Sequence, residues 1–173
     1  KDHPGEVYGY ISIVPTCGMD AVKREISRCS KIEGFLGLKF LPGYYHGELT
    51  APEYQYAMDF ADEVGCPILC HVWGDDPKHR DIDDALKKRH NMKFIIAHQG
   101  GGSEKYTRMT VPIINEYENA YMELCGSMDN RFGVEDIVDM IGEDKVIFGT
   151  DSINLEPKYE LGKVAFSPLD DSV

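Results

Sequence analysis

The sequence predicts an α/β fold of about six strand–helix units. Six apolar runs of strand length begin near residues 8, 36, 68, 94, 121 and 146, a spacing of about 25 to 32 residues that suits one βα unit each. Their hydrophobicity is continuous rather than alternating, as in parallel strands that are covered on both faces. Helical patterns fill the intervals. These observations fit either an open doubly wound sheet or part of a (β/α)8 TIM barrel.

Each element has its own local signal. The second interval opens on Thr50-Ala51-Pro52-Glu53, which reads as a capping box with proline in the first turn, and its helical face continues to Gly65. Glycine commonly ends helices, so we expect a stop there. The other expected helices lie near 22–29, 82–86, 103–118, 134–141 and 156–166, and the expected strands cover 8–14, 36–41, 68–73, 94–98, 121–125 and 146–150.

Length and composition describe an ordinary globular chain. We expect one domain over residues 1–173, with 42% hydrophobic and 28% charged residues. The net charge of −12 argues against binding to nucleic acid or to an anionic membrane surface. No apolar run approaches the roughly 20 residues that span a bilayer. Five cysteines without a C-x-x-C pair, and no signal peptide at the start, predict a reducing, cytoplasmic location.

Three of the apolar runs end in a polar residue that could serve a reaction. His71, His98 and Asp151 each follow such a run, and parallel α/β folds place their active sites at the carboxyl ends of the strands. Because side chains alternate between the two faces of a strand, His71 is expected on the same face as Leu69. By the same rule, His98 is expected on the same face as Phe94 and Ile96. A single histidine at a strand end is more often structural, and an aspartate there is often a helix cap. Together, the three predict a metal-assisted site, since zinc takes three or four N, O or S ligands.

Other residues have weaker signals. Lys39 lies inside an apolar run, where an unpaired charge is costly, so it contacts an anionic substrate, bridges metals after carbamylation, or extends to the rim. Trp73 is a candidate for lining the pocket, together with Tyr44, although aromatic residues are as often plain packing. Glu123 lies in a strand-like run with too weak a pattern to assign. His3, His79 and His90 are expected on the surface.

The order of these phrases resembles the amidohydrolase-2 family, the branch of the metal-dependent amidohydrolases that includes aminocarboxymuconate semialdehyde decarboxylases. The segment Tyr8–Pro15 resembles the third barrel strand, and Gly37-x-Lys39-x-x-Pro42 the fourth. His71 falls in the fifth strand and His98-x-Gly100-Gly101 in the sixth. The eighth is represented by Phe148-Gly149-Thr150-Asp151-Ser152, followed by a helix-like tail at 157–162.

The resemblance implies a TIM barrel with one divalent metal, usually zinc, that acts on a small molecule. His71 would be a metal ligand, and Asp151 a ligand that also takes a proton from the metal-bound water. His98 would orient that water and the substrate without binding metal. The family's reactions are hydrolysis of amides, esters or lactones and decarboxylation of aromatic or muconate-type acids. Lys39, or an arginine such as Arg108, would hold a substrate carboxylate in the second case.

One family element is absent from this sequence. The H-x-H of the first barrel strand does not occur, so the chain corresponds to strands three to eight and is expected to be truncated at both ends. His71 and Asp151 are too few ligands for tight zinc binding. The outer strands of such a piece would have exposed edges, which a second copy of the chain could cover, so a homo-oligomer is one expectation. Three functions follow as hypotheses: a metal-dependent hydrolase, a non-oxidative decarboxylase, and a non-catalytic truncated barrel module.

Overall fold

The computed structural model describes residues 5–126 and 133–169. Its six strands form a single parallel sheet in chain order. They are β1 (Gly9–Ile13), β2 (Phe35–Phe40), β3 (Pro67–Cys70), β4 (Lys93–Ile96), β5 (Ala120–Glu123) and β6 (Val146–Ile147). A doubly wound sheet reverses its strand order at a switch point. Each strand here pairs with the next in the chain, so the fold is a partial TIM barrel. Of the two predicted alternatives, the barrel is confirmed and the doubly wound sheet is excluded.

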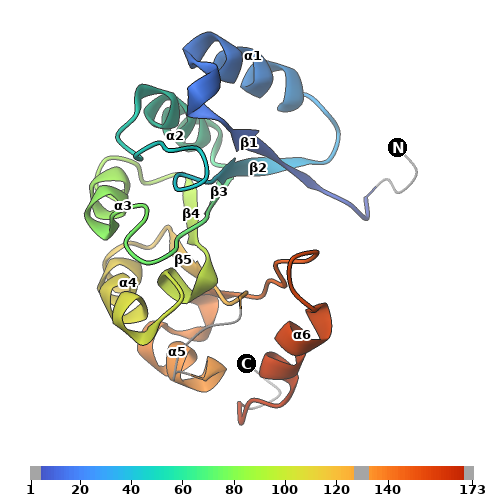
Figure 1. Ribbon diagram of the computed structural model, residues 1–173, viewed down its shortest axis with the longest axis vertical. Helices are drawn as coiled ribbons and strands as arrows, with labels where there is room; N and C mark the ends of the chain where they lie inside the picture. Colours follow the sequence, from blue (N-terminus) through green and yellow to red (C-terminus); the bar gives the residue numbers. More distant parts are fainter. Residues whose placement is uncertain (1–4, 127–132, 170–173) are drawn as a thin grey trace.

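A helix follows each strand. The helices are α1 (Met19–Cys29), α2 (Pro52–Val64), α3 (His79–Leu86), α4 (Glu104–Glu116), α5 (Val134–Ile141) and α6 (Pro157–Ala165), with short 3-10 turns at Pro15–Cys17, His98–Gly100 and Glu143–Lys145. Helices α1 to α5 form an arc along one side of the strands, and α6 lies across from them (Figure 1). None of the helices in the described residues is both long and apolar enough to cross a membrane.

The two faces of the sheet have different characters. Leu38, Ile68 and Phe94 are in register on β2, β3 and β4 and are fully buried in the core beneath the helices. Their neighbours Lys39, Leu69 and Ile95 are in register on the opposite face, which is the interior side of a barrel. The interior face therefore carries the polar groups that extend beyond the strand ends.

The predicted helix ends are confirmed at some residues and wrong at others. Gly65 takes a left-handed conformation (φ 71°) and ends α2, and Gly142 ends α5. The capping box at Thr50 is wrong: the residue before α2 is Ala51, no side chain caps it, and the Thr50 hydroxyl donates to Glu48 instead. Proline at the first helical position already removes one N–H that a cap would satisfy. Helix α4 continues through Pro112 without starting anew.

Candidate active site

His71 continues the line of β3 into the interior of the partial barrel. Its backbone N–H donates to the Phe40 carbonyl at 2.9 Å, so the ladder between β2 and β3 extends one residue past the strand. The ring of Tyr44 meets the His71 ring edge-on, with centroids 5.0 Å apart. His71 thus stands at the strand end, as expected from the sequence.

His98 reaches the same place by a different route from the one predicted. Phe94 and Ile96, which alternation groups with His98, face the buried core under the helices. The strand ends at Ile96, and His98 and Gln99 both adopt positive φ angles (59° and 52°) in a tight turn. The alternation argument is therefore wrong for His98, because a left-handed turn changes the direction of the side chain after the last strand residue.

The two histidines form a direct pair. His98 Nε2 lies 2.8 Å from His71 Nδ1, and the rings are nearly perpendicular. Burial, together with the charges of His98 and Lys39, lowers the pKa of His71 to about 4. Burial also lowers the pKa of His98. Both imidazoles are therefore neutral near pH 7, which is the form that binds metals.

Asp151 completes the set at the end of β6. The strand itself covers only Val146 and Ile147, shorter than expected, and the chain continues to Asp151, which has a positive φ of 47°. Asp151 lines a pocket of about 250 Å³ together with both histidines. The other lining residues are Tyr44, Trp73, Gly126 and Leu155. The structure thus brings together the three residues that the strand ends indicated.

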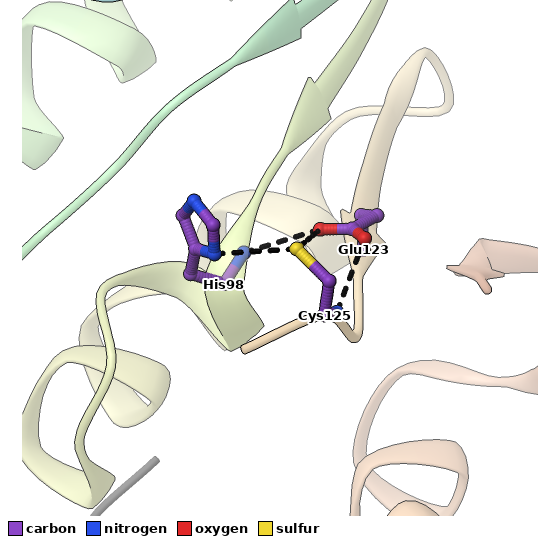
Figure 2. A group of neighbouring side chains, drawn as sticks. All are labelled: His98, Glu123 and Cys125. Carbon is purple, nitrogen blue, oxygen red and sulfur yellow. Dashed lines mark hydrogen bonds between the residues drawn. The ribbon is translucent and has the colours of Figure 1, made fainter. Parts of the chain in front are cut away.

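Glu123 and Cys125, from the end of β5, form a buried cluster with His98 (Figure 2). The Cys125 thiol lies 2.8 Å from Glu123 Oε2 and 3.2 Å from His98 Nδ1. The same carboxylate accepts hydrogen bonds from the backbone N–H groups of His98 and Cys125. The sequence contained one signal, a charged residue in a strand-like run, but nothing in it paired this acid with His98.

Gly149 leaves room for this cluster. A Cβ at Gly149 would lie only 1.7 Å from Glu123 Oε1. Any side chain there must displace the Glu123 carboxylate, which is 6% exposed and holds the backbone of β4 and β5 together. The glycine of the 148–152 phrase therefore allows the segment after β6 to pack against Glu123 of β5.

Replacing Gly149 by Ala is expected to destabilise the protein by about 1–3 kcal/mol, the usual cost of overpacking. The measurement is chemical denaturation followed by circular dichroism. Gly9→Ala is the matched control, because a Cβ at Gly9 meets no atom within 4 Å. Equal stability of the two variants would show that Glu123 can move without cost.

The two predicted substrate-binding residues occupy different positions. Trp73 lines the pocket, with its ring centroid 6.0 Å from that of His98. Lys39 lies on the interior face of β2, opposite Leu69 of β3, and does not line the pocket. It is half-buried, and no hydrogen bond or ion pair joins it to another residue in the described part of the chain.

Two expectations fail at the helices outside the pocket. His79 was expected on the surface but is only 5% exposed. Its Nδ1 lies 2.9 Å from Asp75 Oδ1, and its Nε2 lies 2.9 Å from Thr110 Oγ1. Its Nε2 is also 3.2 Å from the Gly100 carbonyl, so it braces the turn that carries His98. Arg108 pairs with Glu104 along α4 and is not among the pocket residues. It is therefore a poor candidate for holding a substrate.

Comparison with known families identifies the family of this chain. A family model described as Amidohydrolase matches residues 1–171, nearly the whole chain. The chain belongs to the amidohydrolase family. The resemblance read from the strand-end phrases is thereby confirmed. A search of curated proteins found no match.

Solved structures of two decarboxylases and of an uncharacterized TIM-barrel protein share the fold at low sequence identity. A 2,6-dihydroxybenzoate decarboxylase from Rhizobium superposes with a TM-score of 0.70 at 15% identity, over 99% of this chain and 68% of its own. A dihydroxybenzoic acid decarboxylase from Polaromonas sp. JS666, with bound manganese and 2-nitroresorcinol, gives 0.70 at 17% identity, over 99% and 66%. An uncharacterized TIM-barrel protein from Bordetella bronchiseptica gives 0.74 at 15% identity, over 98% and 63%. The amidohydrolase chain therefore spans about two thirds of the length of these structures.

Proposed function

We propose that this chain carries the strand-end half of a mononuclear metal site in an enzyme that hydrolyses an amide, ester or lactone bond of a small molecule. The observation that supports it is the convergence of His71, His98 and Asp151 on one pocket from three separate strands. A structural role for each residue alone would not require a shared cavity. The family membership supports the same interpretation.

The donor set suits a divalent cation. His71 is neutral near pH 7 because of its lowered pKa, and Asp151 offers a carboxylate on the same pocket. Nitrogen and oxygen donors of this kind are taken by zinc and by manganese. The sequence contains no H-x-H, so the remaining ligands of the proposed site would come from a segment outside residues 1–173. We propose zinc as the metal, with manganese as the alternative that the Polaromonas relative supports.

The residues then divide the chemistry between them. A bound divalent cation lowers the pKa of its water towards neutrality and polarises a carbonyl group. His71 and Asp151 would hold the cation, and Asp151 would take the proton that the water releases. His98, which lines the pocket, would orient the water and the substrate. Trp73 and Tyr44 give the small molecule an aromatic wall.

A second candidate is non-oxidative decarboxylation of an aromatic or muconate-type acid. Lys39 supports it although it does not line the pocket: its charge adds to burial in lowering the pKa of His71 and of His98, so its ammonium lies near enough to attract a substrate carboxylate. The aromatic rings of Tyr44 and Trp73 would stack on an aromatic acid. The named decarboxylases among the structural neighbours agree with this candidate.

Metal analysis followed by product analysis tests both candidates. A protein that joins this chain to an H-x-H segment should hold about one divalent metal per chain, and His71→Ala should lose it. His90→Ala is the control, because His90 is an exposed histidine away from the pocket. Carbon dioxide release from aromatic acids would favour the decarboxylase, and cleavage of amides or lactones the hydrolase. A protein that holds no metal and shows neither activity would contradict both candidates and favour the third hypothesis, a non-catalytic barrel module.

A further inference from the structure

We propose that Glu123 and Cys125 are positioning residues that hold His98 as its Nδ1–H tautomer, so that the lone pair of Nε2 faces His71. All three side chains are buried, with exposed fractions of 4% to 6%. Cys125 bridges the other two, as Figure 2 shows. The role of this tautomer in a reaction rests on the proposed function, whereas the measurement that tests the tautomer does not.

The direction of the hydrogen bonds begins at Glu123. Its carboxylate accepts from the backbone N–H of His98 at 3.3 Å and from that of Cys125 at 3.1 Å. A carboxylate has no hydrogen to donate and can only accept. The thiol of Cys125, 2.8 Å from Oε2, must therefore be the donor in that contact.

The single hydrogen of the thiol determines the next contact. Because that hydrogen points to Glu123, the sulfur can only accept from His98 Nδ1, which lies 3.2 Å away. Burial and the charge of Glu123 raise the pKa of Cys125, so the thiol keeps its hydrogen. Nδ1 of His98 therefore carries the proton of the neutral ring.

The far side of the His98 ring is then determined as well. Without a proton on Nε2, this atom accepts the hydrogen bond from His71 Nδ1 at 2.8 Å. Each contact from Glu123 to His71 thus has one possible direction. In the proposed enzyme, this arrangement makes Nε2 a proton acceptor, which a water molecule or substrate reaches only by replacing the hydrogen bond from His71.

Two further contacts hold the bridging cysteine in place. The ammonium of Lys163, on α6, donates to the carbonyls of Leu124 and Gly126, the residues on either side of Cys125. Gly149 leaves the space that the Glu123 carboxylate fills. The cluster is therefore supported from β5, from the segment after β6 and from α6, as expected of groups that orient a reactive side chain.

The test is a measurement of the tautomer by ¹⁵N NMR on the metal-free chain with ¹⁵N-labelled histidine at pH 7. We expect the His98 ring to show a protonated Nδ1 and an unprotonated Nε2. In C125A the sulfur acceptor is lost and only the backbone of residue 125 remains as a partner of the His98 ring, so we expect a mixture of both tautomers. In C125S a hydroxyl can both donate to Glu123 and accept from His98, so the Nδ1–H form should return. E123Q should also produce a mixture.

Several outcomes would overturn the proposal. An Nε2–H tautomer in the unaltered chain would do so even if no variant folds. Wild-type spectra in C125A would exclude Cys125, and wild-type spectra in E123Q would exclude Glu123. A thiolate-to-metal absorption band that appears with cobalt(II) and disappears in C125S would make the cluster a metal site instead. None of these results depends on turnover, so they are distinguishable from a failure of the proposed function.

Where turnover is measurable, C125A should lower it by roughly 10- to 100-fold, the usual effect of losing such a supporting residue. C125S should recover most of the loss. A purely structural role would give equal losses in both variants, and equal losses would contradict the proposal.

Discussion

Replacing His98 by Asn is expected to lower turnover by roughly 10²- to 10⁴-fold, the range that general acid–base groups contribute. The reason is that Asn has no counterpart of Nε2, the atom through which His98 contacts His71 at the pocket. Its side-chain amide can still reach toward Cys125, which limits damage to the buried cluster. Metal content should remain that of the unaltered protein. Steady-state kinetics and elemental analysis of the same preparations measure the two effects.

His90→Asn is the matched control for this prediction, because His90 is exposed and lies outside the pocket. It should leave both turnover and metal content unchanged. Loss of metal from the His98 variant would reassign His98 as a ligand. Unchanged turnover with unchanged metal would remove His98 from the reaction altogether.

Replacing Phe40 by Ala is expected to destabilise the protein by about 3–5 kcal/mol, the usual cost of removing a large aromatic side chain from a core. Phe40 is fully buried at the end of β2, and its ring lies 4.6 Å from that of Tyr54 on α2. The loss would also loosen the backbone that accepts the hydrogen bond from His71. The free energy of unfolding from chemical denaturation measures the effect.

Leu36→Ala is the control within the same strand, since Leu36 is 41% exposed. It should cost less than half as much as the Phe40 substitution. Similar losses for both variants would mean that β2 does not pack against α2 as the structure shows.

Much of the architecture could be predicted because its signals are local. The continuous apolar run at 68–73 overlaps β3 (Pro67–Cys70), and the spaced apolar residues from Tyr54 to Ala61 lie on the buried face of α2. The wrong details occurred where several local solutions compete. At the start of α2, Pro52 makes a side-chain cap dispensable, and β6 pairs over only two residues of an apolar run of five.

The site was predictable to the same extent. His71 and Asp151 follow their strands as the pattern indicates, so both reach the pocket. His98 reaches it although alternation assigns it to the other face, because its positive φ belongs to a turn that a period-two pattern cannot describe. His79 was expected on the surface, since nothing in the sequence around it announces Thr110 or the Gly100 carbonyl as partners.

The sequence by itself determined the α/β class, the βα repeat and the three strand-end residues His71, His98 and Asp151, because hydrophobic periodicity and strand ends are local properties. Only the tertiary structure decided between an open sheet and a partial barrel, since strand order depends on which distant segments pair. It alone placed Glu123 and Cys125 against His98, 25 and 27 residues away in the chain. That contact depends on the register between β4 and β5, which no local pattern encodes.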